Sequence, residues 1–217
     1  DKNHLQEVYT GFGDTLFVFE SPTPFSFPTR LKTKHRKWYY DGYGIPSELV
    51  DVNNDGRDEY IYRGSDSLHG NKVFVAKYDT LNNSLQRIWG ERLPPNCIQG
   101  DCVSSLAIGD PDHDGFKDIV TSAFSGNAYV IEYVTQDSFA VTWTDSLSVA
   151  GRVATGDVDG NGLEEFFVGG NQPEVDGVHM RIYAYESTGN NTFQPYFSFD
   201  IYPVAYFSVD LYQTVDV

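Results

Sequence analysis

The sequence predicts an all-β protein assembled from repeated four-stranded sheets, and three observations support that prediction. A short motif rich in Asp and Gly occurs three times, beginning at Asp51, Asp110 and Asp157. After each copy the chain follows one order: a strand-like run, a Gly-containing turn, a second aromatic-rich run, a polar turn, and a third run with a large aromatic residue. Apolar residues alternate along these runs, as expected for strands in stacked sheets, and no amphipathic helical pattern interrupts them.

The spacing of the motifs gives the size of the repeat. The starts at Asp51, Asp110 and Asp157 are separated by 59 and then 47 residues. That is about the length of a four-stranded blade in a β-propeller, a ring of radially arranged sheets. Strands joined by loops at regular intervals also favour this architecture. The sequence therefore predicts a β-propeller of four-stranded blades.

The two ends of the chain are expected to share one blade. The N-terminal region supplies its last three strands, predicted at 5–9, 16–20 and 36–40. The third of these carries Trp38, and the Pro-rich segment 21–28 before it is a loop, because proline is not accommodated in a central strand. Near the other end, 204–209 reads as a first strand.

The predicted domain is single and spans 1–217. Complete blades are assigned to 46–95, 103–148 and 151–200, and 1–45 with 200–217 form the split blade. Pairing of the C-terminal strand with the N-terminal three would close a four-bladed ring and remove exposed sheet edges. The alternatives are an arc of a larger propeller, or a final strand that docks on the next molecule.

Large aromatic residues recur at one position of the repeat. Trp38, Trp89, Trp143 and, in the third complete blade, Phe197 occupy it. We expect the three tryptophan side chains to pack between blades.

Each motif places oxygen-bearing side chains at its positions one, three, five and nine and glycine at position six. Calcium requires several oxygen ligands at once, and a short loop supplies them from alternate residues with a glycine at the sharp turn. The seventh residue would offer its backbone carbonyl. The predicted metal ligands are Asp51, Asn53, Asp55, Arg57 and Glu59 in the first loop, Asp110, Asp112, Asp114, Phe116 and Asp118 in the second, and Asp157, Asp159, Asn161, Leu163 and Glu165 in the third. We therefore expect about three calcium ions.

Two other interpretations of the motifs are weaker. An EF-hand loop needs a glutamate at position twelve and a helix on each side. Here the twelfth residues are Tyr62, Thr121 and Val168, and the flanks read as strands. Ordinary polar turns would not be expected to recur three times in one register between strands.

The nine-residue loops resemble the FG-GAP or VCBS-type repeat, the calcium-loop β-propeller repeat of integrin α-subunit head domains and of many secreted microbial proteins. The resemblance extends over nearly the whole chain at the level of motifs. It implies a blade whose first two strands are joined by a calcium loop, and it implies no particular activity.

The net charge of −16 argues against nucleic acid or an anionic membrane as a partner. Ten of the 31 acidic residues are predicted ligands, so three calcium ions would bring the net charge to −10. No run of 18 apolar residues is present, so no membrane-spanning helix is expected.

Two features fit an exported protein. Cys97 and Cys102 are the only cysteines, and a disulfide between them would close a small loop, although two unrelated thiols are the alternative. Asn82 and Asn190 lie in N-x-S/T sequons within predicted turns, which leaves glycosylation open. We expect an extracellular or cell-surface location.

A cationic segment departs from the acidic background. It holds Arg30, Lys32, Lys34, Arg36 and Lys37, followed by aromatic residues. Such a segment can bind an acidic polysaccharide or protein surface, but the solvent-facing side of a long hairpin is the more frequent origin.

No catalytic residues are predicted. The five histidines are scattered, and neither a nucleophile motif nor a phosphate-binding glycine loop occurs. The sequence favours a non-catalytic extracellular module, stabilised by calcium, that binds a protein or glycan ligand or self-associates. The alternatives are the propeller of a secreted lyase or glycosidase acting on polysaccharide, and the subunit of an extracellular filament linked by strand exchange.

Overall fold

The structure of the protein is a computed structural model that describes residues 3–12, 15–36, 47–66, 70–91, 93, 103–123, 126–147, 151–174 and 177–202. All regular elements in these ranges are β-strands, as the sequence predicts. The described residues include no helix that could cross a membrane.

The strands form four antiparallel sheets, which we number I to IV in chain order. Sheet I contains β1 (Glu7–Phe12), β2 (Thr15–Glu20) and β3 (Arg30–Arg36). Sheet II contains β4 (Ser47–Val50), β5 (Glu59–Asp66), β6 (Gly70–Asp79) and β7 (Ser84–Glu91). Sheet III contains β8 (Val103–Gly109), β9 (Asp118–Ala123), β10 (Asn127–Thr135) and β11 (Ser138–Ser146). Sheet IV contains β12 (Arg152–Gly156), β13 (Glu165–Glu174), β14 (Gly177–Gly189) and β15 (Thr192–Ile201).

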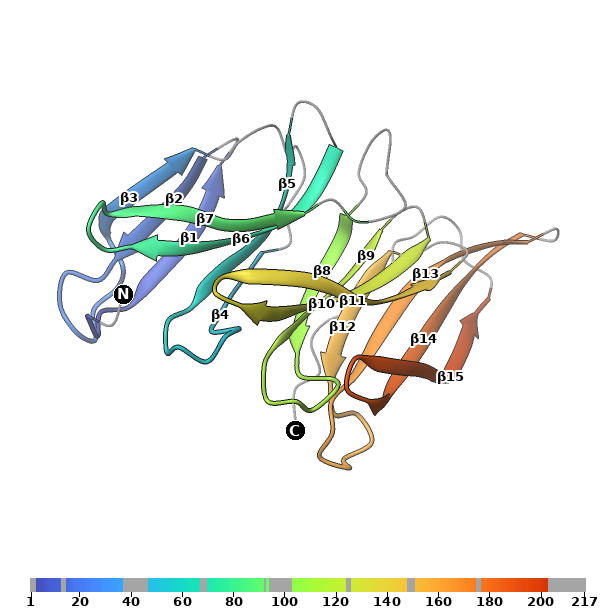
Figure 1. Ribbon diagram of the computed structural model, residues 1–217. Coiled ribbons are helices and arrows are strands. Elements are labelled where there is room, and N and C mark those ends of the chain that lie inside the picture. The colour runs from blue at the N-terminus through green and yellow to red at the C-terminus, as the bar shows by residue number, and fades with distance from the viewer. Residues whose placement is uncertain are drawn as a thin grey trace.

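Each strand pairs with the next one along the chain, so every sheet is a meander of hairpins. The sheets follow one another in chain order, with sheet I and sheet IV at opposite ends of the row (Figure 1). The first strands of sheets II, III and IV lie close together, since β8 of sheet III contacts both β4 of sheet II and β12 of sheet IV. β9 is buried along its whole length, as expected for a strand in a sheet that is covered on both faces.

Apolar side chains fill the spaces between neighbouring sheets. The core between sheets II and III contains Ile61, Val75, Leu106 and Tyr129. The core between sheets III and IV contains Val130, Phe166, Tyr185 and Phe193, and a smaller cluster joins Leu16 of sheet I to sheet II. Burial of this apolar surface stabilises the stack at about 25 cal/mol per Å² removed from water.

The third strand of sheet I begins earlier than the sequence predicts. The prediction placed it at 36–40, whereas β3 pairs with β2 from Arg30 opposite Glu20 to Arg36 opposite Thr15. This register brings Arg30 and Lys32 to the carboxylate of Glu20. The cationic segment is therefore only partly solvated, because the Lys32 side chain is 9% exposed.

The repeated aromatic position lies between sheets, as expected. The ring of Trp89 on β7 is 5.5 Å from that of Phe139 in sheet III. The ring of Trp143 on β11 is 5.5 Å from those of Phe166 and Phe193 in sheet IV. Trp38 lies outside the described residues.

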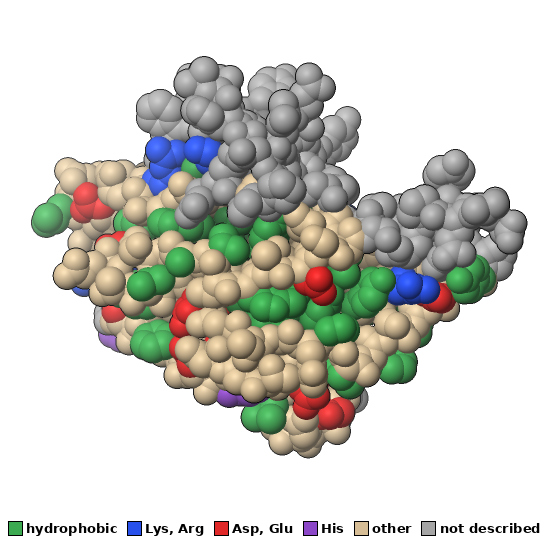
Figure 2. All heavy atoms as spheres, turned by 45° about the vertical axis from the view of Figure 1, so that its right-hand side comes forward, with side chains coloured by type: hydrophobic (Ala, Val, Ile, Leu, Met, Phe, Trp, Pro, Cys, Tyr) green, Lys and Arg blue, Asp and Glu red, His purple; other side chains and the backbone are tan. Residues whose placement is uncertain are grey.

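The outer surface of sheet IV carries exposed apolar side chains. Phe197 is 54% exposed, and its ring lies 6.0 Å from that of Phe199 on the same strand. Figure 2, which brings the sheet IV side forward, shows hydrophobic side chains open to the surface over this face.

Three predictions concern segments outside the described residues. Residues 203–217 contain the strand expected to close the ring, so that pairing stays a prediction, and the described sheets form an open arc. Cys97 and Cys102 also lie outside this part of the chain, and so does Lys37.

Candidate metal centre

The three motif loops occupy equivalent places in sheets II, III and IV. Each joins the first strand of its sheet to the second: β4 to β5, β8 to β9, and β12 to β13. All three lie on the same edge of the molecule, at the lower side of Figure 1. The predicted ligands are therefore gathered along one rim.

The three loops share one pattern of backbone hydrogen bonds. The carboxylate of the first Asp accepts a hydrogen bond from the backbone N–H of the glycine at position six, at 2.6 Å for Asp51, 3.2 Å for Asp110 and 2.8 Å for Asp157. The side-chain oxygen at position five accepts from the backbone N–H at position seven, at 2.9 Å for Asp55, 2.8 Å for Asp114 and 2.7 Å for Asn161. These hydrogen bonds from the loop backbone hold the side-chain oxygens of positions one and five toward the inside of the loop.

Left-handed backbone conformations produce the sharp turn. Gly56, Gly115 and Gly162 at position six have φ values of 77°, 93° and 86°. Glycine tolerates this region because it has no Cβ. Position four is also left-handed in every loop, and His113 occupies it in the second, where its side chain is exposed.

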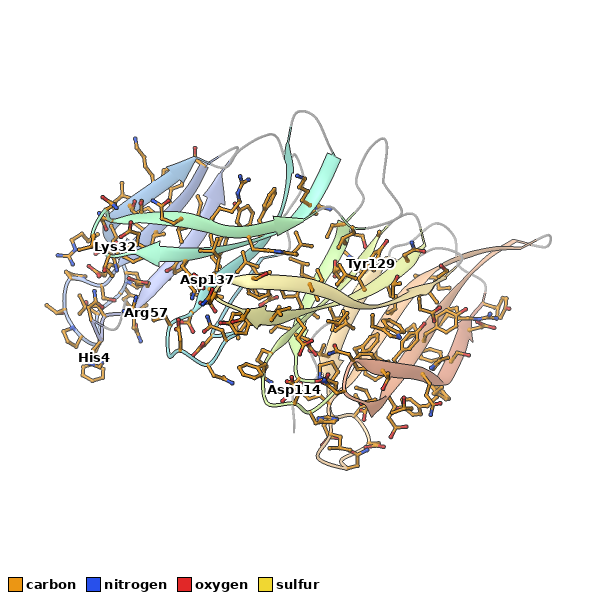
Figure 3. The ribbon with its side chains drawn as sticks, viewed as in Figure 1. His4, Lys32, Arg57, Asp114, Tyr129 and Asp137 are labelled. Atoms are coloured by element: carbon orange, nitrogen blue, oxygen red, sulfur yellow. The ribbon has the colours of Figure 1, made fainter. Side chains whose placement is uncertain are left out.

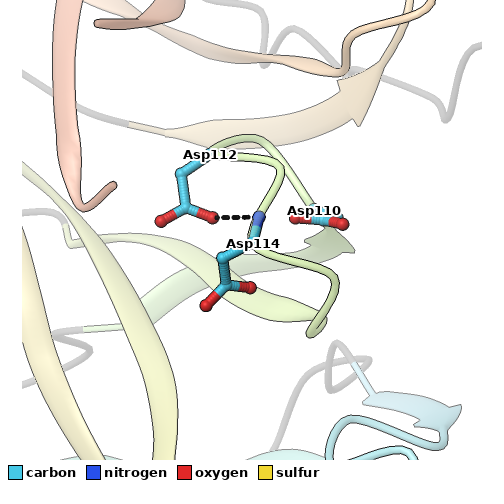
Figure 4. Close-up of side chains that lie close together, drawn as sticks. All are labelled: Asp110, Asp112 and Asp114. Carbon is cyan, nitrogen blue, oxygen red and sulfur yellow. Dashed lines mark hydrogen bonds between the residues drawn. The ribbon is translucent and has the colours of Figure 1, made fainter. Parts of the chain in front are cut away.

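Two of the loops bring three carboxylates together. Oxygen atoms of Asp110, Asp112 and Asp114 lie within 4.8 Å of one another, as do those of Asp157, Asp159 and Glu165. Figure 4 shows the first of these clusters, with the backbone N–H of Asp114 donating to Asp112 at 3.3 Å. The loop at 51–59 is not among the clusters found in the described residues.

The carboxylate at position nine of the second loop has no hydrogen-bond partner in the part of the chain that the structure describes. Asp118 is 1% exposed, and neither of its oxygens receives a hydrogen bond from the described residues. In the other two loops the backbone N–H at position two donates to the ninth residue, at 3.0 Å from Val52 to Glu59 and from Val158 to Glu165. The second loop has Pro111 at position two, and proline has no N–H to donate.

Burial and mutual repulsion disfavour ionisation of these ninth residues. Burial, with the charges of Asp112 and Glu132, raises the pKa of Asp118 to about 9. Burial raises the pKa of Glu59 to about 7, although the hydrogen bond from Val52 opposes this shift. Burial and the nearby acidic groups also raise the pKa of Glu165. A divalent cation would remove this penalty, because it supplies opposite charge and accepts several oxygen ligands.

The residue across the hairpin from position nine differs between loops. The registers Tyr60↔Ala76, Ile119↔Ile131 and Phe166↔Tyr185 place Lys77, Glu132 and Glu186 in this position. The sequence motif did not include these residues, because they lie on the third strand of each sheet, 14 to 21 residues after the loop's ninth residue. Only strand register reveals them.

A partial fourth copy of the motif, in which Asp1, Asn3 and Glu7 stand at positions three, five and nine, lies at the N-terminus and was not predicted from the sequence. The backbone N–H of Leu5 donates to Asn3 at 2.9 Å, as position seven donates to position five in the other loops. His4, in the place of the glycine, has a φ of 62°, and Glu7 begins the second strand of the motif as Glu59 does. The spacing of Asp1, Asn3 and Glu7 was the available signal, and histidine in place of glycine obscured it.

Neighbouring loops contact one another along the rim. The side chain of Asn54 donates to the carbonyl of Gly115 at 2.6 Å, and the backbone N–H of Asp110 donates to Glu164 at 2.8 Å. A hollow of 380 Å³ separates the N-terminal copy from the loop at 51–59. The labelled residues His4, Arg57 and Asp114 follow this rim in Figure 3.

The second loop also contacts the next sheet. Asn191, in the turn between β14 and β15, donates its backbone N–H to Asp112 at 2.9 Å and its side-chain N–H to Glu132 at 2.7 Å. The acidic cluster of sheet III therefore holds a hairpin of sheet IV.

Both sequons lie in turns of the described chain. The side chain of Asn82 is exposed and donates to Asp79 at 2.6 Å, and Asn190 is exposed in the β14–β15 turn.

Comparison with known proteins identifies the kind of fold but no family. No family model matches the sequence, and no curated protein matches it. A solved structure described as "Crystal structure of BBS1N in complex with ARL6DN, soaked with lead" matches with a TM-score of 0.52 and 10% sequence identity. The match covers 91% of this chain and 65% of that one, so this chain spans less than two thirds of its neighbour's length. Four meandering antiparallel sheets and a neighbour with propeller-like architecture show that the fold is of the β-propeller kind.

Proposed function

We propose that the protein is a calcium-stabilised, non-catalytic extracellular module that binds a protein or glycan ligand or assembles on a surface. Its loops at 110–118 and 157–165 would each hold a calcium ion, and the resemblance of these loops to FG-GAP or VCBS-type repeats supports the choice of metal. Clusters of carboxylate oxygens without histidine or cysteine suit a hard divalent cation.

The observation that carries the proposal is the unpaired carboxylate of Asp118. A buried charged group without a partner is costly, and proteins normally pair such groups or coordinate them to a metal. Asp118 has no such partner among the described residues, and four further acidic groups surround it. A calcium ion bound by the loop would satisfy it.

Metal binding by the loop at 110–118 would stabilise both its own sheet and the contact with the next sheet. Asp110 and Asp118 flank the junction of β8 with β9, so an ion between them ties these strands together. Asp112 accepts a hydrogen bond from Asn191 of sheet IV, so ordering of the loop also steadies the contact between sheets. Metal binding is thereby coupled to folding.

The direct test compares thermal unfolding in calcium, in magnesium and in a chelator. We expect the melting temperature to fall on chelation and to recover with calcium more fully than with magnesium, because calcium accepts larger and less regular oxygen cages. A melting temperature that is the same in chelator and in calcium would overturn the proposal.

A substitution at Asp118 gives a sharper test, because its two effects have opposite signs. Asp118→Asn removes a carboxyl group that has to take up a proton to be buried without metal, so the metal-free protein should gain about 1–3 kcal/mol of stability at neutral pH. The same change removes a ligand, so the stabilisation by calcium should shrink. The control Asp58→Asn removes an exposed carboxylate at position eight of the first loop, which is not a predicted ligand, and should change neither quantity. A stabilisation by calcium that is the same in Asp118→Asn and in the wild type would show that Asp118 is not a ligand.

We further propose that the arc is completed by another sheet packed on sheet IV. Trp89 and Trp143 each contact the sheet that follows their own, whereas Phe197, at the same repeat position, is 54% exposed.

A further inference from the structure

The first loop already has a positive charge at its carboxylates. The ammonium group of Lys77 lies 3.2 Å from Asp55 and 3.6 Å from Glu59, which are positions five and nine of this loop. The Glu59 oxygen nearest to it is buried and receives no hydrogen bond within the described chain. Lys77 also contacts Asp137 of sheet III at 2.5 Å. The Lys77 side chain is 22% exposed, and of its three partners Glu59 is fully buried whereas Asp55 and Asp137 are 42% and 43% exposed.

The equivalent residues in the other loops carry the opposite charge. Glu132 and Glu186 occupy the register position of Lys77 in sheets III and IV. The two loops with a glutamate there are the two in which three carboxylates converge. The residue across the hairpin from position nine therefore distinguishes the loops. In the first loop it is a lysine, which supplies a positive charge, and in the other two it is a glutamate, which adds a negative charge.

The N-terminal copy of the motif is neutralised in a comparable way from another strand. Glu7 and Glu20 face each other at the start of β1 and the end of β2, as Glu59 and Lys77 do in sheet II. Lys32 of β3 pairs with both glutamates. Sheets I and II therefore both place a lysine ammonium beside the ninth residue of the motif, although the two lysines come from different strands.

We propose that Lys77 takes the place of the metal ion in the loop at 51–59. The ammonium group pairs with ligands at positions five and nine and repels a divalent cation, so this loop keeps its shape without metal. Calcium then binds only the loops at 110–118 and 157–165, and this part rests on the function proposed above. The N-terminal half of the arc is built without metal and the C-terminal half requires it.

The test counts bound calcium in the full chain and in Lys77→Gln. Equilibrium dialysis with metal analysis should give two ions for the wild type, one for each carboxylate cluster. Lys77→Gln should bind one ion more and should melt lower than the wild type in chelator, with calcium restoring most of the difference. Lys34→Gln is the control, since it removes the same charge from an exposed position on β3. An unchanged count in Lys77→Gln would overturn the role of Lys77.

A reciprocal variant tests the same idea without weakening the first loop. Glu132→Lys combined with Asn191→Asp copies the Lys77–Asp137 pair into sheet III, because Asp137 and Asn191 occupy the same place in their turns, with φ values of 64° and 56°. We expect this double variant to bind one ion fewer than the wild type and to melt higher than it in chelator. A count that stays the same would contradict the proposal.

The outcomes separate the two proposals. A wild-type chain that binds no calcium refutes the proposed function, whereas the difference between Lys77→Gln and wild type still measures the effect of Lys77. A wild-type chain that binds three ions supports calcium binding and refutes the replacement by Lys77.

Discussion

At the scale of single residues, the carboxylates of sheet I show how strongly a fixed cation can act. Burial opposes ionisation of Glu20, but hydrogen bonds from Arg30, Asn3 and Lys32 outweigh it and lower the pKa of Glu20 from 4.5 to about 2. A carboxyl group with a lowered pKa in the folded state stabilises the protein above its unfolded pKa. That contribution is lost as the pH falls from about 4.5 through about 2.

Glu20→Gln should therefore destabilise the protein at neutral pH but much less in acid. We expect a loss of about 1–3 kcal/mol at pH 7, because Arg30 and the buried Lys32 lose their shared partner. The difference between variant and wild type should narrow below about pH 4.5, where the carboxyl group takes up a proton in the unfolded wild type but not yet in the folded one. Urea unfolding of both proteins from pH 7 to pH 3 measures this, and a difference that is constant over this range would contradict the assignment.

Residue spacing identified the oxygen-bearing side chains of the loops. It did not identify the charged side chains from other strands that lie beside them. The pattern Asp-x-Asp/Asn-x-Asp/Asn-Gly is local, so the sequence shows it directly. Lys77, Lys32 and Glu132 reach the same carboxylates through strand register and sheet packing, which span 14 to 25 residues of the chain. The consequence of Pro111 was visible in principle, since a missing N–H can be read from sequence. The structure was needed to show that, in the other loops, the N–H at this position donates to the carboxylate of the ninth residue.

At the scale of the elements, the contact between consecutive loops depends on a glycine at the end of β8. A Cβ on Gly109 would lie 2.3 Å from the carboxylate of Glu164 and 2.8 Å from the Cβ of Thr155. The Glu164 side chain can move away, but Thr155 lies on β12 and belongs to the packed interface between sheets III and IV. The two sheets can approach this closely only because residue 109 has no side chain.

Gly109→Ala should push these two sheets apart. We expect a loss of about 1–3 kcal/mol in the free energy of unfolding, the usual cost of an added methyl group in a packed contact. Gly160→Asn is a matched control within the third loop, because Asn54 shows that asparagine accepts the left-handed conformation at this position. Chemical denaturation of both variants decides the point. A Gly109→Ala protein as stable as the wild type would mean that the interface is looser than these distances imply.

Strand order could be predicted better than strand position. The alternating apolar runs after each loop gave the order of strands in sheets II to IV, because each run must bury one face against a neighbouring sheet. β3 was misplaced because its sequence, RLKTKHR, carries few apolar residues. It forms a strand since its cations pair with Glu7 and Glu20, an interaction between strands that periodicity does not express.

At the scale of the whole molecule, Phe197 distinguishes an open arc from a closed ring. The repeat places this residue where Trp89 and Trp143 are covered by the following sheet, yet it is 54% exposed in the described structure. Phe199 and Ile201 on the same strand are 43% and 37% exposed. Contiguous apolar surface of this kind is a frequent site of association.

We predict that the 217-residue chain self-associates through sheet IV as its concentration rises, because none of the described sheets covers Phe197. Phe197→Lys should reduce this association, since it places a charge in the centre of the apolar face. Phe27→Lys should leave it unchanged, because Phe27 is 87% exposed in the loop before β3 and far from this strand in sequence. Sedimentation velocity over a range of concentrations in calcium measures all three proteins. A wild-type chain that stays monomeric throughout would contradict the open arc, and would instead favour a four-bladed ring in which residues 203–217 and sheet I cover Phe197.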